Sequence, residues 1–522
     1  MLPSLFRNLG YGGLFDATFL SGVAGVQVPQ CLSRRDECYN LKNKLHLENT
    51  TIISATYVEP NSTVNTAGSC QSNATVTSSI CRVYASVNTS SISSTKFELW
   101  LPDKWYGRFL TVGNGGFAGC IDYMNTDYGA TEHFATVGSD GGHDGVDSSA
   151  FFNNSEVLVD FSWRAVHVSA VLGKQIVAEY YSSPVSYSYY LGCSTGGRQA
   201  YMAATRFPED FDGIVGGSPA VNNWILASWQ GIASKWIGAP DLSSPKHISA
   251  PQWDTIHAEI LAQCDGLDGI LDGIITEPDN CRLDFTSLAC QDALNSTSCL
   301  TKEQLDVLNN IFNPLIGIKG ELLWPRLDPG FEANDGWTAL LSGSFAFFAE
   351  GFFRDVVYTD KFHNFDNFSL PDLYFSSFLD AADISTWSPD LSTFRANGGK
   401  YLTYHGHADS LIPAGISKIT YDRVATNLSL SSLDDFYRLF LISGMGHCTG
   451  GGDTTAYLIG NAGLSTIGVN DTEHSVLLAI VHWVESGVAP EVILGTTPNG
   501  TERAHCRYGQ RSALVDNIWV CM

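Results

Sequence analysis

The sequence predicts an α/β protein with a parallel central sheet and a large inserted domain. From about residue 108, apolar strands alternate with helical segments, a pattern typical of parallel α/β sheets. The alternation resumes near residue 400, after a stretch of different composition. With 522 residues, 44% of them hydrophobic and only 16% charged, the chain is long and apolar enough to bury a large core.

Strands are expected first in the N-terminal part of the chain. Residues 38–110 are rich in Ser, Thr, Val and Asn, and contain short runs in which apolar and polar residues alternate. Alternation with a period of two is typical of strands. The clearest runs are Thr50–Val58 and Phe97–Leu101.

The parallel strands are expected in two later groups. Residues 163–182 carry Ala, Val, Leu and Tyr at helical spacing, and they separate two strands of the first group. The second group follows the interruption and completes the sheet. The predicted strands are Phe109–Gly113, Phe134–Gly138, Tyr187–Gly192, Lys400–Tyr404 and Tyr437–Ser443.

An inserted domain is expected between the two groups. Residues 222–395 are rich in Trp and Phe and contain four clustered cysteines and several prolines. Because this stretch is too apolar for a linker, we interpret it as a domain inserted into a core formed by residues 31–221 and 396–522. Residues 1–30 are interpreted as a degenerate signal segment outside the fold, since Asp16 interrupts their apolar run.

The charge balance excludes two classes of partner. The formal charge is −25, from 29 Lys and Arg against 54 Asp and Glu. Nucleic acid and anionic membranes both attract basic surfaces, so neither is expected as a partner. No run of 18 or more apolar residues is present, so a transmembrane helix is not expected either.

The cysteines and glycosylation motifs indicate the compartment. Thirteen cysteines occur together with many Asn-x-Ser/Thr motifs. Together they predict a secreted, extracellular glycoprotein with disulfide bonds. The motifs begin at Asn49, Asn61, Asn73, Asn88, Asn153, Asn295, Asn367, Asn427, Asn470 and Asn499.

A nucleophile is predicted at Ser194. Residues 192–196 read Gly-Cys-Ser-Thr-Gly, which fits Gly-x-Ser-x-Gly. This motif forms a sharp turn between a strand and a helix and lifts the serine above the sheet. Tyr187–Leu191 supplies the strand, and residues 197–205 supply the helix.

An acid and a base are predicted in the loops after the last two strands. In this architecture the chain order is Ser, acid, His. Asp409 follows the strand that ends at Tyr404, and His447 follows the strand that ends at Ser443. Both would lie at the strand ends beside the serine. His405, His407 and His474 are alternative candidates for the base.

Two cysteines directly flank the predicted nucleophile and base. Cys193 precedes Ser194, and Cys448 follows His447. A disulfide between them would fix the two loops to each other at a Cα separation of roughly 5.5 Å.

These motifs resemble the tannase/feruloyl esterase family, whose hallmark is Cys-Ser…Asp…His-Cys with the two cysteines bonded. The similarity extends from about Cys38 to the end of the chain. It rests on residues 192–199 (GCSTGGRQ), 405–409 (HGHAD) and 444–448 (GMGHC), with further similarity at 113–119 and 206–212. The resemblance implies an α/β-hydrolase core, a lid domain bearing Ca²⁺, and hydrolysis of phenolic esters.

The oxyanion hole follows from the elbow geometry. One donor is the backbone N–H of the residue after the nucleophile, here Thr195. The second is expected from the loop after the Phe109–Gly113 strand, at Gly115 or Gly116, and we assign it to Gly116.

A calcium site is predicted in residues 264–275. Asp265, Asp268 and Asp272 are each followed by glycine, and crowded carboxylates with flexible glycines suit Ca²⁺. The loop is not an EF-hand, because Thr276 stands where the twelfth-position Glu would be. The resemblance implies that the carbonyls of Ile270 and Ile274 complete the ligand set.

The other cysteines can be paired in part. Short spacing predicts Cys264–Cys281, Cys290–Cys299 and Cys506–Cys521. The family resemblance implies Cys38–Cys81 and Cys70–Cys120. Cys31 is left over, and it could take the place of Cys38.

The leading function is a secreted serine esterase without an organic cofactor. Feruloyl esterase activity on hydroxycinnamoyl esters of plant cell-wall polysaccharide, as in xylan degradation, is favoured over tannase activity on galloyl esters. The alternatives from other classes are a non-catalytic carbohydrate-binding protein and a serine peptidase on the same fold. Aromatic residues of the lid could form the acyl pocket, although most are expected in its core: Trp224, Trp229, Trp236 and the cluster Phe345–Phe353.

Overall fold

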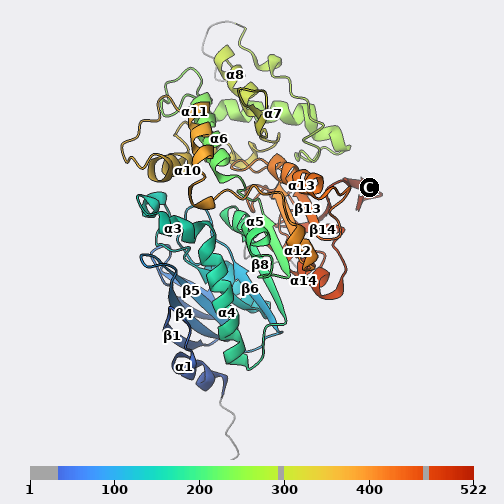
Figure 1. Cartoon of the computed structure of the whole chain (residues 1–522). Coiled ribbons are helices and arrows are strands. Elements are labelled where there is room, and N and C mark those ends of the chain that lie inside the picture. Colours follow the sequence, from blue (N-terminus) through green and yellow to red (C-terminus); the bar gives the residue numbers. More distant parts are fainter. Residues whose placement is uncertain (1–32, 292–298, 462–469) are drawn as a thin grey trace, which may run out of the picture.

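The computed structural model describes residues 33–291, 299–461 and 470–522 (Figure 1). In this part of the chain, nine strands form one sheet in the order β1-β4-β5-β7-β6-β8-β9-β12-β13. The pairs from β1 to β7 are antiparallel, and those from β7 to β13 are parallel. The strands are β1 (Thr50–Val58), β4 (Ile80–Asn88), β5 (Ser94–Pro102), β6 (Arg108–Val112), β7 (Ala135–Ser139), β8 (Tyr187–Cys193), β9 (Gly213–Gly217), β12 (Lys400–Gly406) and β13 (Tyr437–Ile442).

The predicted strands are confirmed, with small differences at their ends. The parallel strands β6, β7 and β8 are almost entirely buried, because helices cover both faces of the sheet. The mixed sheet with its flanking helices confirms the α/β-hydrolase arrangement expected from the sequence.

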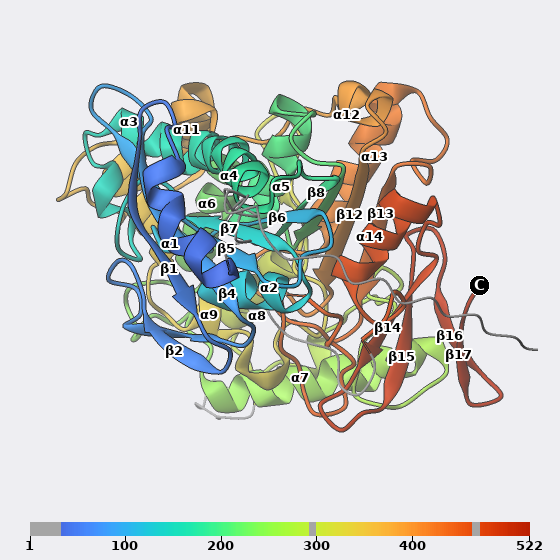
Figure 2. The same cartoon turned by 90° about the horizontal axis from the view of Figure 1, so that it is seen from below.

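Helices cover the sheet on both sides, as Figure 2 shows. α4, α5 and α13 pack on one face and belong to the larger apolar core. α2 and α14 pack on the other face and form a second core with the opposite sides of the same strands. α1 lies along β1 at the sheet edge. These helices are α1 (Arg34–Lys44), α2 (Tyr123–Thr131), α4 (Ala165–Tyr181), α5 (Thr195–Arg206), α13 (Gly415–Leu428) and α14 (Val476–Ser486).

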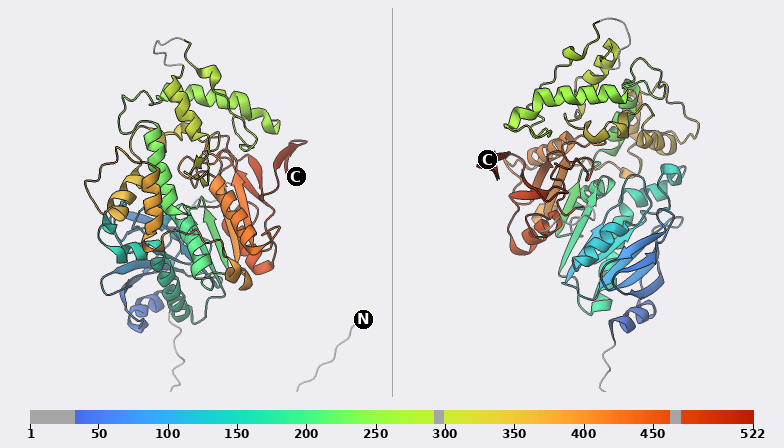
Figure 3. Two further views of the ribbon diagram at one scale, coloured as in Figure 1. Left: turned by 45° about the horizontal axis from the view of Figure 1, so that its top comes forward. Right: turned by 180° about the vertical axis from the view of Figure 1, so that it is seen from behind.

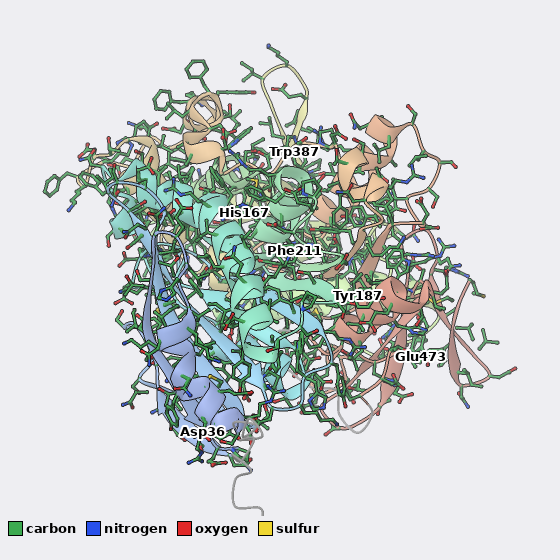
Figure 4. All side chains as sticks on the ribbon, turned by 60° about the horizontal axis from the view of Figure 1, so that its bottom comes forward. Asp36, His167, Tyr187, Phe211, Trp387 and Glu473 are labelled. Carbon is green, nitrogen blue, oxygen red and sulfur yellow. A yellow bond between two sulfur atoms is a disulfide. The ribbon has the colours of Figure 1, made fainter. Side chains whose placement is uncertain are left out.

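Side-chain contacts join these helices to the loops between strands. His167 on α4 reaches the loop before β9, where its Nδ1 lies 2.7 Å from Asp210 Oδ2. Figure 4 labels His167 of α4 and Phe211 of the loop before β9. Phe211 in turn packs against Tyr190 of β8, with ring centroids 5.5 Å apart.

Residues 222–395 form a helical layer at one end of the sheet, seen from two further sides in Figure 3. Within its described residues, this layer contributes no strand to the large sheet and contains one short two-stranded ribbon. Its division from the core as a separate domain stays a prediction. Its elements are α6 (Asn223–Trp236), α7 (Ala250–Cys264), α8 (Lys302–Ile311), β10 (Leu315–Ile316), β11 (Leu322–Trp324), α9 (Thr338–Leu341), α10 (Phe347–Phe352), α11 (Leu370–Leu379) and α12 (Ser392–Ala396).

Short ribbons and one short helix lie outside the large sheet and the helical layer. The ribbon β14–β15 and the hairpin β16–β17 lie in the C-terminal part of the chain. None of the helices in the described residues has the length and apolar character that a membrane span requires. The elements are β2 (Ser62–Asn65), β3 (Asn73–Val76), α3 (Ser155–Val159), β14 (Val492–Thr496), β15 (Glu502–Cys506), β16 (Ser512–Val515) and β17 (Ile518–Cys521).

Six disulfides join the described cysteines, and all six predicted pairs are confirmed. Cys38 is bonded to Cys81, so the alternative in which Cys31 takes its place is wrong. Cys31 itself lies outside the described residues. The pairs are Cys38–Cys81, Cys70–Cys120, Cys193–Cys448, Cys264–Cys281, Cys290–Cys299 and Cys506–Cys521.

Candidate active site

Ser194 occupies a strained turn between β8 and α5. Its φ of 63° and ψ of −118° lie in a region that residues with a side chain rarely adopt. Glycines make the turn possible. A Cβ on Gly192 would lie 2.9 Å from the backbone of Gly196, and a Cβ on Gly197 would lie 2.3 Å from the carbonyl oxygen of Gly217. The predicted elbow is therefore present.

The strained turn is held by its backbone hydrogen bonds. Ser194 N donates to Gly217 O at 3.0 Å, and Ser194 O accepts from Ala220 N at 3.0 Å. Both partners belong to β9 or the loop after it, the next strand of the sheet. The nucleophile position is thus fixed by strand pairing.

Asp409 and His447 meet at the carboxyl ends of β12 and β13. These strands are neighbours and run parallel, so the loops that follow them lie at the same sheet edge. His447 Nδ1 lies 2.8 Å from Asp409 Oδ2. If Nδ1–H donates to the carboxylate, Nε2 is left free to accept a proton.

The carboxylate of Asp409 is buried and held as an anion. Its side chain is fully buried, and Oδ1 accepts from the backbone N–H groups of Leu411 and Ile412, each at 2.9 Å. Burial raises the pKa of Asp409, but the charge of His447 and hydrogen bonds from His405 and His447 outweigh it. The pKa of Asp409 therefore lies well below its usual value.

The three alternative histidines are placed elsewhere. His405 is buried behind the acid, with Nε2 3.3 Å from Asp409 Oδ2. His407 Nδ1 lies 2.8 Å from Asp328, and His474 Nδ1 lies 2.8 Å from Asp471. Among the described residues, His447 is the histidine that lines a cleft together with Ser194.

The Cys193–Cys448 disulfide joins the two loops beside the predicted nucleophile and base. Its Cα atoms are 5.8 Å apart, close to the value expected from the sequence. Cys448 has a positive φ of 65°, and its carbonyl accepts from Asn461 Nδ2. The loop that carries His447 is therefore held both by the disulfide to Cys193 and by the hydrogen bond from Asn461.

Thr195 and Gly116 lie together beside Ser194. Thr195 is the first residue of α5, so its N–H has no partner within the helix. Its Oγ1 donates to Gly116 O at 2.7 Å. Both residues line the same cleft as Ser194, whereas Gly115 is not part of that lining.

An amide pair fixes the loop that contains Gly116. Asn114 N donates to Gln199 Oε1, and Gln199 Nε2 donates to Asn114 Oδ1, both at 3.0 Å. Both side chains are buried. Gln199 lies within the GCSTGGRQ motif, but its pairing with Asn114 depends on the fold and was not predicted from the sequence.

The cleft that contains Ser194 and His447 has a largely apolar lining. Of the predicted aromatic residues, Phe348 of α10 lines it, whereas Trp229 is buried in the core. The lining consists of Gly116, Phe117, Ser194, Thr195, Ala220, Asn223, Leu226, Ala227, Gln230, Phe348, Leu411, Ile412 and His447.

The predicted calcium loop carries an excess of negative charge. Arg503 of β15 lies 3.0 Å from Asp272 and 3.3 Å from Asp268. Asp265 Oδ1 instead accepts from Gly273 N at 3.1 Å. Three carboxylates against one guanidinium leave the charge that a divalent cation would neutralise, and their oxygens are of the kind that Ca²⁺ prefers.

The carboxylates of this loop do not converge on one point. Within the described residues, no three His, Cys, Asp or Glu side chains are grouped as a metal site. Burial raises the pKa of Asp272, as do the charges of Asp268 and Asp265, against the opposite effect of Arg503. The residues fit Ca²⁺ in chemistry and charge, and the carboxylates would have to turn toward the ion.

Comparisons with known proteins agree with this geometry. The family model described as tannase and feruloyl esterase matches residues 80–514. Probable feruloyl esterase B-2 from Aspergillus terreus is 39% identical over 515 residues, which cover 94% of this chain and 97% of that protein. Feruloyl esterase C from Talaromyces stipitatus is 39% identical over 507 residues, covering 93% and 94%. The crystal structure of feruloyl esterase B from Aspergillus oryzae matches with a TM-score of 0.90 at 38% identity, covering 94% of this chain and 100% of that one.

Proposed function

The chain belongs to the tannase and feruloyl esterase family of carboxylic ester hydrolases, and on this premise we propose that it hydrolyses hydroxycinnamoyl esters through an acyl-enzyme on Ser194. The observation that carries the proposal is the hydrogen bond between His447 and Asp409 in a cleft that Ser194 shares. Acyl transfer requires a serine, a base that takes its proton, and an acid that orients the base.

In the first half-reaction, Ser194 Oγ attacks the ester carbonyl carbon, and His447 Nε2 takes the hydroxyl proton. Asp409 keeps the imidazole in the right tautomer and stabilises the imidazolium. Collapse of the tetrahedral intermediate breaks the bond to the alcohol oxygen, which receives the proton from His447. Water then repeats the sequence on the acyl-enzyme, which releases the acid and restores Ser194.

The charge that develops on the carbonyl oxygen needs backbone donors. The N–H of Thr195 and the N–H of Gly116 are the proposed pair, supported by their position beside Ser194 in the cleft. Loss of one such donor typically costs about 10²–10³-fold in kcat. The Asn114–Gln199 pair holds the Gly116 loop in place.

The lining of the cleft favours a hydroxycinnamoyl over a galloyl group. Phe117 and Phe348 offer flat aromatic surface, and Leu226 adds aliphatic surface. Outside Ser194, Thr195 and His447, the polar side chains in the lining are Asn223 and Gln230. A galloyl ring carries three neighbouring hydroxyls, and unpaired hydroxyls in an apolar pocket are costly. The names of the related feruloyl esterases point in the same direction.

Extracellular glycosylation and calcium binding belong to the same proposal. All the predicted glycosylation motifs within the described residues have an exposed Asn, and Asn295 lies outside them. Plant cell-wall polysaccharide is the expected carrier of the ester. The proposed calcium ligands are Asp265, Asp268, Ile270, Asp272 and Ile274, and the bound ion would neutralise the acidic loop and stabilise the helical layer.

A panel of esters tests the proposed function. Methyl ferulate, methyl gallate and a peptide anilide are offered to the same preparation, and kcat/KM is measured for each. We expect methyl ferulate to be hydrolysed best. Preference for methyl gallate would indicate a tannase, cleavage of the anilide a peptidase, and no turnover of any of them a non-catalytic protein.

A further inference from the structure

Gln230 of α6 carries a buried amide oxygen that lacks a hydrogen-bond partner. The residue is 3% exposed. Its Nε2 donates to Leu411 O at 3.1 Å. Since a carbonyl oxygen can only accept, this contact fixes the orientation of the amide and leaves Oε1 as the free acceptor. Within the described residues, Oε1 has no partner.

Such an acceptor is uncommon in a folded protein. Most buried polar side-chain atoms have a partner, and an unpaired one destabilises the fold. Gln230 lies in the lining of the cleft that contains Ser194. Its Oε1 and Asn223 Oδ1 are the two amide oxygens without a partner among the lining residues, and a donor on a molecule bound in the cleft would pair with Oε1.

The position of Gln230 along α6 suggests which donor this is. Asn223, Leu226, Ala227 and Gln230 all line the cleft, and their spacing places them on one face of the helix. Asn223 begins α6 and comes three residues after Ala220, whose N–H donates to the backbone carbonyl of Ser194. Gln230 lies seven residues further, roughly 10 Å along the axis at about 1.5 Å per residue.

An acyl group that starts at Ser194 and extends along this face would pass Asn223, Leu226 and Ala227 and meet the amide of Gln230 at its far end. A hydroxycinnamoyl group suits this path, since its carbonyl and its 4-hydroxyl are separated by a propenoyl spacer and an apolar ring. A galloyl group lacks the spacer and is shorter by two carbons. Phe117 and Phe348 line the same cleft, with ring centroids 5.4 Å apart.

We propose that Gln230 Oε1 accepts the hydrogen bond of the substrate's 4-hydroxyl group and thereby selects 4-hydroxycinnamoyl esters over unsubstituted cinnamoyl esters. This inference rests on the proposed function. Gln230 takes no part in proton transfer and acts as a specificity-determining residue. A site that pairs a substrate hydroxyl disfavours the analogue without it, because the buried acceptor is then left unpaired.

The test compares kcat/KM for methyl 4-hydroxycinnamate, methyl cinnamate and methyl 4-methoxycinnamate. The wild type is expected to prefer the first by about tenfold or more. The 4-methoxy ester keeps the oxygen but lacks the proton, so it should behave like the cinnamate or worse. Gln230→Met keeps the length of the side chain and removes the acceptor, and it should reduce the preference to within about twofold.

Asn223→Leu is the matched control, because it removes the other free amide oxygen of the cleft. It is expected to change all three esters by a similar factor. If the preference disappears in Asn223→Leu and persists in Gln230→Met, the phenol lies at the other end of α6 and the inference is wrong.

The wild-type measurement separates this inference from the proposed function. Turnover of all three esters at similar kcat/KM would overturn the role of Gln230 and leave the esterase assignment intact. Turnover of none of them, with methyl gallate hydrolysed, would overturn the proposed acyl specificity itself. Thermal melting of Gln230→Met shows whether the variant is folded, and the wild-type ratio tests the predicted preference even where it is not.

Discussion

His405 Nε2 lies 3.3 Å from Asp409 Oδ2, the same carboxylate oxygen that His447 Nδ1 contacts at 2.8 Å. The same nitrogen lies 2.8 Å from Ile412 O, and Nδ1 lies 2.7 Å from Ser417 Oγ. Both ring nitrogens are therefore engaged in a fully buried position. His405 is a positioning residue that holds the acid, rather than the base that its sequence neighbourhood also allowed.

Replacement of His405 by Phe should lower kcat by about 10- to 100-fold. The hydrogen bond from His405 lowers the pKa of Asp409 and helps to hold its carboxylate. Its loss should therefore lower kcat with little change in KM, which a general loss of folded protein would not cause selectively. Ser417→Ala removes only the outer partner and should have a smaller effect. A wild-type kcat in folded His405→Phe would contradict the positioning role.

Ser194→Ala should abolish ester hydrolysis and leave the fold intact. The backbone turn is set by its glycines and strand contacts, and Ala has the same Cβ as Ser. We expect kcat to fall by about 10⁴-fold or more, with an unchanged circular dichroism spectrum. Ser183→Ala, at an exposed position, serves as the control. Activity within tenfold of wild type would remove Ser194 from the mechanism.

Loss of the Cys193–Cys448 disulfide should reduce catalysis as well as stability. Without it the nucleophile and base loops can drift, and a misplacement of about 1 Å can cost around a hundredfold in rate. Cys193→Ala/Cys448→Ala is measured at a temperature where it remains folded. The control is Cys506→Ala/Cys521→Ala, whose bridge joins β15 and β17. That variant should have a lower melting temperature and a near-normal kcat. Equal losses of kcat in the two variants would argue against a special catalytic role for the Cys193–Cys448 bridge.

Calcium should raise the melting temperature, and a chelator should lower it. A ligand that binds only the native state at about 100 times its Kd adds roughly 2.7 kcal/mol. Asp268→Asn removes one of the three proposed carboxylate ligands and should abolish most of the response. Asp254→Asn, exposed on α7, should respond like wild type. A full calcium response in Asp268→Asn would place the ion elsewhere.

Asp140 should make stability fall as the pH rises from about 4 to 6. Burial raises the pKa of this carboxyl to about 6, although it accepts from Lys96 N, Thr95 Oγ1 and Gly142 N. In this range the folded state binds more protons than the unfolded state, so unfolding becomes easier with rising pH. The shift corresponds to about 3 kcal/mol.

Urea unfolding of wild type and Asp140→Asn across this pH range checks the effect. The variant lacks the titrating carboxyl. The difference in free energy of unfolding between Asp140→Asn and the wild type should therefore shift in favour of the variant as the pH rises. Parallel curves for the two proteins would show that Asp140 titrates normally in the fold.

The sequence by itself determined the features that depend on local chemistry. The elbow is encoded in residues 192–196 because only glycine permits such close backbone contacts around the serine. Alternating strands and helices fixed the chain order of Ser194, Asp409 and His447, and the flanking cysteines indicated the bridge that the structure contains. Short loops between neighbouring cysteines made three further pairs predictable.

The tertiary structure decided what depends on contacts between distant segments. Neither composition nor spacing distinguishes a histidine behind the acid from one in front of it, and the order β8-β9-β12-β13 is what separates His405 from His447. Arg503, far along the chain, reaches two carboxylates of the acidic loop. The amide of Gln230 is oriented by Leu411 O, so its free acceptor depends on the packing of α6 against the loop that carries Leu411. A side chain's partners are set by the packing of whole elements, which a local pattern does not contain.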